Sequence, residues 1–404
     1  MIEQIRDLIN DRRNDGLHEY RQDNFIQFMK SPVQPYKESP TRLRYVDFTD
    51  DLVEKMVLGE PEDDAKGYGQ GDEDFAFVNG KLMVYNGKGC IVEPIREAER
   101  KYPNLIFDYT DKENVDDRYE YLINAGFYDG FLVYLPPNKS SEIKAVDFAK
   151  STSSFAAKNL IIVGEGSSLN FTRYIVGGGE GNGAQGDNTY IFLSRNSSIV
   201  YSQVQDRPKT VDGIQFLKTF MEDNTQATIH HVENGYNKSI IMTESYQKGN
   251  FTNYQLRGVS FTRGLQQMDL RDNTIQIGTH SIANIYVRGI VREKSLTMHR
   301  GNIDIKESGR KAEGYYDTRI LLLSKEAYAN TKPALLINNN DVKSKHASAV
   351  TNIDEESLFY LRSRGIDEET AKNLIIEGFT EHVVEGAPDA VRNAVRKFAG
   401  ISED

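Results

Sequence analysis

The chain has 404 residues, and its 49 Lys and Arg against 60 Asp and Glu give a formal net charge of -11. A chain of this length folds into about two to four domains and buries an ordinary core without covalent staples. Cys90 is the single cysteine, so an intrachain disulfide, a multi-cysteine zinc site and a dithiol redox motif are excluded. The acidic balance argues against nucleic acid as a main partner.

The N-terminal domain is predicted to be mixed and to cover residues 1–130. Ile2, Ile5, Leu8 and Ile9 follow a helical period, which predicts one amphipathic helix. This opening stretch mixes charged residues with isolated apolar ones and therefore lacks the unbroken apolar segment of a secretory signal. No run of about 18 uncharged apolar residues, as a membrane-spanning helix needs, exists anywhere in the chain. We therefore expect a cytoplasmic protein without membrane contact.

Two segments of this domain are predicted to lack regular structure. Three prolines, Pro32, Pro35 and Pro40, predict an extended segment. The acidic, glycine-containing stretch 60–74 is expected to be a solvated loop; the alternative is a divalent-cation site, whose oxygen ligands need a fixed spacing that this stretch lacks.

Residues 131–350 are predicted to be all-β. About a dozen short β-branched and aromatic runs of three to seven residues, from Leu160–Val163 to Leu335–Ile337, follow one another without a long helix. A sandwich, a barrel and a solenoid all fit this pattern. Hairpin signals are nearly confined to Asp212-Gly213 and Asn234-Gly235, which favours a solenoid whose parallel coils enclose a continuous apolar column.

Residues 351–404 are predicted to form a small helical tail domain. The three helices are bounded in order by Asp354 and Gly365, by Asp367 and Gly378, and by Pro388 and Gly400. Apolar stripes on the first two helices are expected to face one another; their members are Leu358, Phe359, Leu361, Ala371, Leu374 and Ile375.

The glycine-rich segment 177–186 contains the formal dinucleotide fingerprint Gly181-x-Gly183-x-x-Gly186. The fingerprint needs a helix N-terminus after it to hold a pyrophosphate, whereas the next residues read as a strand. We predict a flexible loop that projects from the β region. The sequence also has no Gly-x4-Gly-Lys-Ser/Thr motif, so we expect no nucleotide on this chain and any nucleotide energy to come from a partner.

Histidines concentrate in the β region, which raises a metal hypothesis because imidazole is a common metal ligand. The five are His230, His231, His280, His299 and His346. The competing interpretation is that each is a surface residue or a hydrogen-bonded strand residue.

Two further sets of residues have a chemical and a structural interpretation. Asp269, Arg271 and Asp272 resemble the acid and cation sets of polysaccharide-cleaving solenoids, or they form a solvent-facing charge cluster at a turn. The lysines Lys81 and Lys88 lie near Cys90 in sequence and would lower its pKa, or the thiol is structural.

The C-terminal part of the β region resembles a known family. Residues 341–347 (DVKSKHA) lead into residues 354–366 (DEESLFYLRSRGI), and this stretch is similar to the SufB/SufD family of the Suf iron-sulfur cluster assembly system. Earlier segments, such as HRGNIDI at residues 299–305 and YYDTRILLLS at residues 315–324, are also similar to family segments and occur in the same order. The resemblance spans about residues 125–380.

That resemblance implies a right-handed parallel β-helix with an N-terminal domain and a C-terminal helical domain. It implies a non-enzymatic scaffold that pairs through its β-helix with a SufB-like or identical protomer. It also implies that the helical tail docks a SufC-like ABC-type ATPase. The positions carried over for docking are Leu358, Phe359, Tyr360, Leu361, Arg362, Arg364 and Gly365.

The departures from the family pattern favour the SufD-like branch. The SufB branch has a cysteine in the β-helix and a glutamate next to the late histidine, whereas this chain has no cysteine after Cys90 and Ala347 follows His346. His346 is thus the one candidate ligand for iron or a transient iron-sulfur cluster, flanked by Lys343 and Lys345. A polysaccharide-acting enzyme and a purely structural β-helix are the alternative functions.

Overall fold

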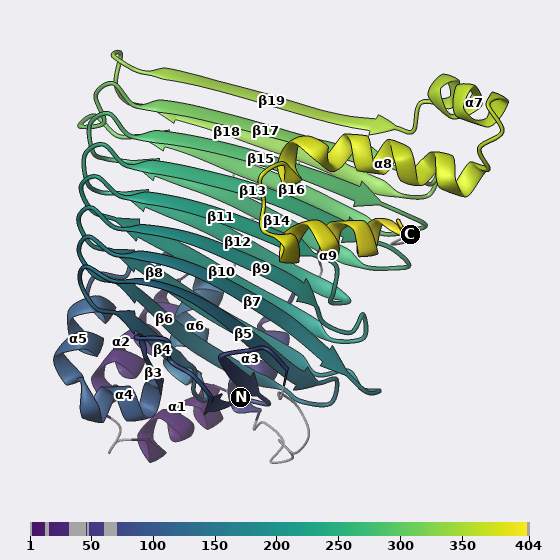
Figure 1. Cartoon of the computed structure of the whole chain (residues 1–404). Helices are drawn as coiled ribbons and strands as arrows, with labels where there is room; N and C mark the ends of the chain where they lie inside the picture. The colour runs from purple at the N-terminus through teal and green to yellow at the C-terminus, as the bar shows by residue number, and fades with distance from the viewer. Residues whose placement is uncertain (1, 13–15, 32–45, 47, 60–70, 402–404) are drawn as a thin grey trace.

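The computed structural model describes residues 2–12, 16–31, 46, 48–59 and 71–401 (Figure 1). The predicted extended segment around Pro35 and most of the acidic stretch, residues 60–70, lie outside the described residues. The N-terminal elements are α1 (Ile2–Asp11), α2 (His18–Lys30), α3 (Asp50–Leu58), β1 (Phe75–Val78), β2 (Lys81–Val84), β3 (Ile91–Pro94), α4 (Ile95–Lys101), α5 (Pro103–Thr110) and α6 (Arg118–Gly126). The predicted first helix is confirmed. Of the helices described, none has the length and apolar character needed to cross a membrane.

The chain then forms a parallel β-solenoid, as predicted. Its strands are β4 (Phe131–Leu135), β5 (Ser140–Lys150), β6 (Phe155–Val163), β7 (Ser168–Gly178), β8 (Ala184–Leu193), β9 (Ser198–Asp206), β10 (Asp212–Met221), β11 (Gln226–Glu233), β12 (Lys238–Gln247), β13 (Asn253–Thr262), β14 (Gln267–Gln276), β15 (Ile282–Val291), β16 (Leu296–Ile305), β17 (Glu313–Leu322), β18 (Tyr328–Ile337) and β19 (Lys343–Asn352). Odd-numbered strands from β5 join a ten-stranded sheet, and even-numbered strands join a nine-stranded sheet. Ser140 lies beside Ser168 and Ser168 beside Ser198, so one coil takes 28 to 30 residues here.

The chain turns through the same kind of corner at each passage from the nine-stranded to the ten-stranded sheet, from β4–β5 to β16–β17. One residue there has a positive φ, and its N–H donates to a carbonyl of the next coil over 2.7–3.1 Å. The residues are Asn138, Gly166, Asn196, Asn224, Phe251, His280 and Lys311. A single left-handed residue thus replaces the two-residue hairpin turn, which explains why hairpin signals are scarce.

The strands from β5 onward have 8 to 11 residues and are longer than the predicted three to seven. The prediction was too short because polar residues lie inside the strands, as in β14 with the sequence QMDLRDNTIQ. Backbone hydrogen bonds between parallel strands form whatever the side chains are, so a polar residue does not end a strand. The polar side chains, whether they face solvent or the lumen, interact with side chains of neighbouring coils.

The segment 177–186 is a correction to the sequence analysis. Gly177 and Gly178 end β7, and Ala184 already begins β8. The short connection packs on the preceding coil, where Gly183 N–H donates to Ser151 O over 2.6 Å. The prediction of a flexible projecting loop was therefore wrong, while the strand that follows agrees with the rejection of a dinucleotide site.

The lumen is not the continuous apolar column that we expected. One side is apolar and includes Phe171 and Tyr201, whose rings stack 5.6 Å apart. The other side is polar: the buried Arg173 guanidinium lies 2.5 Å from Asp147 and 2.6 Å from Asp187. Charged residues are stable there because each has an opposite charge at hydrogen-bonding distance.

The C-terminal helices are α7 (Glu355–Ser363), α8 (Glu368–Val384) and α9 (Asp389–Ala399). Asp354 and Asp367 cap α7 and α8 as predicted, and Gly365 and Gly400 follow α7 and α9 with positive φ. The predicted end at Gly378 was wrong. The helix continues because residues on both sides of the glycine are buried, and this burial outweighs the helix penalty of glycine, about 1 kcal/mol.

The first two helices do not bury facing apolar stripes. Figure 1 shows α8 and α9 lying across the outer face of the ten-stranded sheet, while α7 extends beyond it. Val232, Phe261 and Ile290 of that sheet pack with Val383 and Val391 of the helices. No residue of α7 is buried. Helix α7 still contacts α8 through Arg362 and Glu368, but the buried Ile376 and Val383 of α8 pack on the solenoid.

The N-terminal helices cover the outer face of the nine-stranded sheet through two buried lysines. Lys158 Nζ of β6 lies 2.6 Å from Glu113 and 2.7 Å from the Tyr20 hydroxyl. Lys218 Nζ of β10 lies 2.7 Å from Glu120 of α6. Burial lowers the pKa of Lys158 and raises the pKa of Glu113, so desolvation opposes the charges that the pair itself favours.

Replacing Lys158 with Met is expected to lower the free energy of unfolding by about 3–5 kcal/mol, because Glu113 loses its buried partner. The double variant Lys158→Met, Glu113→Leu should recover most of that loss, since no unpaired charge remains. Urea unfolding measures both. The matched control is Lys343→Met, which removes the exposed 2.7 Å pair with Glu313 and should leave the unfolding midpoint unchanged. A double variant as unstable as the single one would contradict the buried-charge explanation.

Candidate functional site

The predicted ligand His346 lies on β19, the last strand of the ten-stranded sheet, and its side chain is exposed. Its backbone neighbour on β17 is Tyr316. Lys343 pairs with Glu313, and Lys345 is exposed; both lysines have the opposite strand parity to His346 and therefore lie on the other face of β19. The site is thus one open imidazole on an edge strand.

The other four histidines have surroundings that differ from those of His346. Burial lowers the pKa of His230 to about 4 and that of His299 to about 3. His299 contacts the Ser260 and Thr318 hydroxyls at 3.0 and 3.2 Å. His280 is a corner residue that stacks on Phe251 at 4.8 Å. Across the part of the chain that the structure describes, no three His, Cys, Asp or Glu side chains form a set that could hold a metal ion.

Cys90 is half-buried at the start of β3 and does not fit a reactive thiol. Burial raises its pKa, which is opposite to the predicted effect of nearby lysines. Lys88 is instead bound to Asp74, with Nζ 2.9 Å from the carboxylate. Of the two interpretations, the structural thiol is the one that this environment supports.

The residues proposed for polysaccharide chemistry do not form one site. Asp269 and Arg271 face outward on β14, and Asp269 binds both Arg271 and Arg300. Asp272 has the opposite parity on the strand and lies inside the lumen, 3.3 Å from His231. The cluster also lies within a buried strand and not at a turn, so both interpretations of these three residues were wrong.

Helix α7 presents the residues carried over for partner docking. Phe359 is 73% exposed and Tyr360 is 55% exposed, although both are large and apolar. Leu358 and Leu361 are half-buried. Arg362 lies 3.4 Å from Glu368 of α8, Arg364 lies over the Tyr360 ring, and Gly365 with a φ of 88° lets the chain turn into α8.

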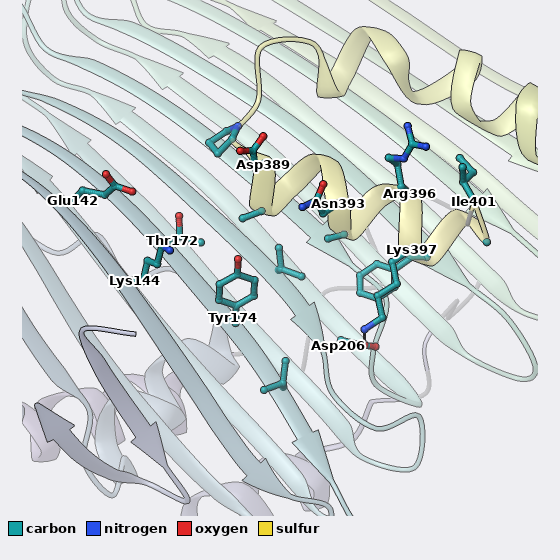
Figure 2. A pocket seen from close by; sticks show the side chains of 17 residues that line it. Glu142, Lys144, Thr172, Tyr174, Asp206, Asp389, Asn393, Arg396, Lys397 and Ile401 are labelled. Atoms are coloured by element: carbon teal, nitrogen blue, oxygen red, sulfur yellow. Dashed lines mark ion pairs between the residues drawn. The ribbon is translucent and has the colours of Figure 1, made fainter. Parts of the chain in front are cut away.

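A groove of about 1040 Å³ runs between α9 and strands β5, β7 and β9 (Figure 2). Figure 2 shows Tyr174 on the sheet side and Asn393 on the helix side of this groove. Its charges are mixed, as in the Lys397 and Asp206 pair at 3.9 Å. Its lining residues include neither His346 nor any residue of α7, so this groove is separate from both.

The arrangement so far is a parallel solenoid with an imidazole at its open end and an exposed helix beside it. A family model described as SUF system FeS cluster assembly, SufBD core domain, matches residues 147–379, which is more than half of the chain. The chain belongs to the SufB/SufD family. Its role is therefore in iron-sulfur cluster assembly, in a family whose members are generally scaffold or assembly proteins. The comparison with curated proteins found no match.

Sequence reasoning on this SufB/SufD-family chain missed the inward-facing polar residues. His231, Glu233 and Asp272 were visible as ionisable residues in β runs, but nothing in the sequence gave their direction. Whether a side chain points into the lumen or outward depends on its odd or even position along the strand. That position depends on the strand register, which no local hairpin signal fixes in this solenoid.

Proposed function

We propose that the chain is a SufD-like scaffold subunit that docks an ABC-type ATPase through α7 and pairs with a second scaffold protomer through the open end of its solenoid. The observation that carries the docking part is α7 itself. A nine-residue helix that fully buries none of its side chains gains little stability from packing on its own chain. Its exposed Phe359 and Tyr360 supply the aromatic anchors typical of interface hot spots.

The pairing part rests on the end of the stack. Strands β18 and β19 are the terminal strands of their sheets and have a strand neighbour on one side only. Leu336, Ile337 and Val350 are 51%, 42% and 40% exposed there. Pro333 and Lys345 on these strands discourage unspecific edge pairing, which favours one matched partner, either a SufB-like or an identical protomer.

The SufD-like assignment follows from the residues that remain for cluster chemistry. His346 offers one nitrogen ligand, and the chain's only thiol, Cys90, lies immediately before β3 at the opposite end of the stack from β19. Iron or a cluster is cargo here, and its further ligands, above all sulfur, come from the partner protomer. The absent P-loop fits a subunit that depends on a SufC-like ATPase for nucleotide energy.

Replacing Phe359 or Tyr360 with Asp should abolish co-purification of the ATPase, because a carboxylate in a desolvated aromatic anchor position opposes binding. The matched control is Leu265→Asp, at a turn residue that is also 73% exposed but lies on the solenoid. ATPase retained by the α7 variants, or lost equally in the control, would remove the docking proposal.

Replacing Leu336 and Val350 together with Asp should shift the scaffold from dimer to monomer in light scattering. The added charges make end-to-end burial unfavourable, while urea unfolding of the monomer should stay close to that of the parent chain. A dimer that persists in the double variant would place the protomer contact elsewhere.

Replacing His346 with Ala should lower the iron and sulfide recovered with the assembled complex and leave the dimer and the ATPase contact intact. His280→Ala, at an exposed corner histidine, is the control and should retain the metal. Unchanged iron content in the His346 variant would exclude it as a ligand.

A further inference from the structure

The lumen holds a cluster of three ionisable side chains that the cluster-assembly role does not use. His231 and Glu233 point inward from β11 of the ten-stranded sheet, and Asp272 points inward from β14 of the nine-stranded sheet. His231 Nε2 lies 3.3 Å from Asp272, and His231 Nδ1 lies 3.9 Å from Glu233. All three side chains are at most 1% exposed. The cluster therefore spans the lumen between the two sheets without solvent.

Both ring nitrogens of His231 face a carboxylate oxygen. A neutral imidazole has one N–H and one lone pair, so one nitrogen would then turn its lone pair toward a negative oxygen. In a buried site this repulsion is large, because no water screens it. An imidazolium, which donates from both nitrogens, removes the conflict. Gly258 leaves the space for the ring, since a Cβ there would lie 2.3 Å from His231 Nε2.

The groups around the cluster bring no compensating charge. Gln203 of β9 donates to Glu233 over 3.1 Å, and His299 of β16 stays neutral because burial lowers its pKa to about 3. Burial, and then the charge of Asp272, raise the pKa of Tyr254 on β13 and Tyr316 on β17, so both remain neutral. One proton on His231 thus leaves a net charge of about minus one, and a second proton makes the cluster neutral.

We propose that His231, Glu233 and Asp272 form a proton-controlled tie that holds the two sheets together in the middle of the solenoid. With two protons bound, the His231 imidazolium lies between the Asp272 carboxylate of one sheet and the neutral Glu233 carboxyl of the other. When these protons leave, two carboxylates face a neutral ring across a dry lumen, and the coils around β11 and β14 loosen.

The pH dependence has one sign for both groups. The pKa of Glu233 rises from 4.5 to about 7, chiefly through burial, so the stability linked to its proton is lost as pH rises from about 4.5 to 7. For His231, burial lowers the pKa, but Asp272 and Glu233 outweigh this and raise it. Its stabilisation is full below about 6.5 and is lost as pH rises through the higher folded value.

Urea unfolding of the full chain between pH 5 and 9 tests the tie. For each proton that the folded chain binds more tightly than the unfolded chain, the unfolding equilibrium constant should increase up to about tenfold per unit rise in pH. Glu233→Gln keeps an oxygen for Gln203 and should reduce this slope by one proton relative to the parent chain. His280→Gln, at an exposed corner histidine, should leave the slope unchanged. Equal slopes for Glu233→Gln and the parent chain would overturn the proposal.

A second measurement on the parent chain decides the matter even where a variant fails to fold. In histidine-labelled protein, the ring signals of His231, assigned through their couplings to its own backbone, should show an imidazolium at pH 7. A neutral His231 ring at pH 6 would overturn the proposal whatever the slopes show.

Discussion

The repeated left-handed corner is the constraint on which this structure depends. Each corner residue donates its backbone N–H to a carbonyl of the next coil. The residue that turns the chain therefore also joins one coil to the next. The rest of the architecture follows from this period. Side chains at one register lie above each other on successive coils, as in the column formed by Leu160, Tyr190 and Lys218.

A solenoid built from such coils leaves an unpaired strand edge at each end, because every coil can accept another one. At the N-terminal end β1 pairs with β5, β3 pairs with β4, β2 pairs with β1, and helices cover one face. At the other end, β18 and β19 keep exposed apolar side chains, and α7 carries unburied aromatic residues close by. Solenoids require capping for solubility, so the features that leave this end unfinished as a fold are those that suit it for assembly.

The sequence predicted the coarse architecture because the relevant signals are local. Capping aspartates, left-handed glycines and the 3.6-residue period report on their own turn of chain, and Asp354, Asp367 and Gly400 were placed correctly for that reason. Gly378 failed because burial of α8 against the sheet, a non-local effect, outweighed the cost of one glycine. Strand length failed similarly, since Asn273 or Asp272 inside β14 is tolerated only through contacts with other coils.

Direction across a strand was the larger gap, and it decides the chemistry. Asp269, Arg271 and Asp272 are neighbours in sequence, yet the first two lie on the outer face and the third lies in the lumen with His231. Residues two apart share a face and residues one apart do not, so a single step of register separates an outward-facing ion pair from a lumen-facing one. For His346 the same rule places an imidazole on a strand that lacks one neighbour. His346 and its neighbour Lys345 therefore lie on opposite faces of β19, next to Tyr316 and Tyr315 of β17.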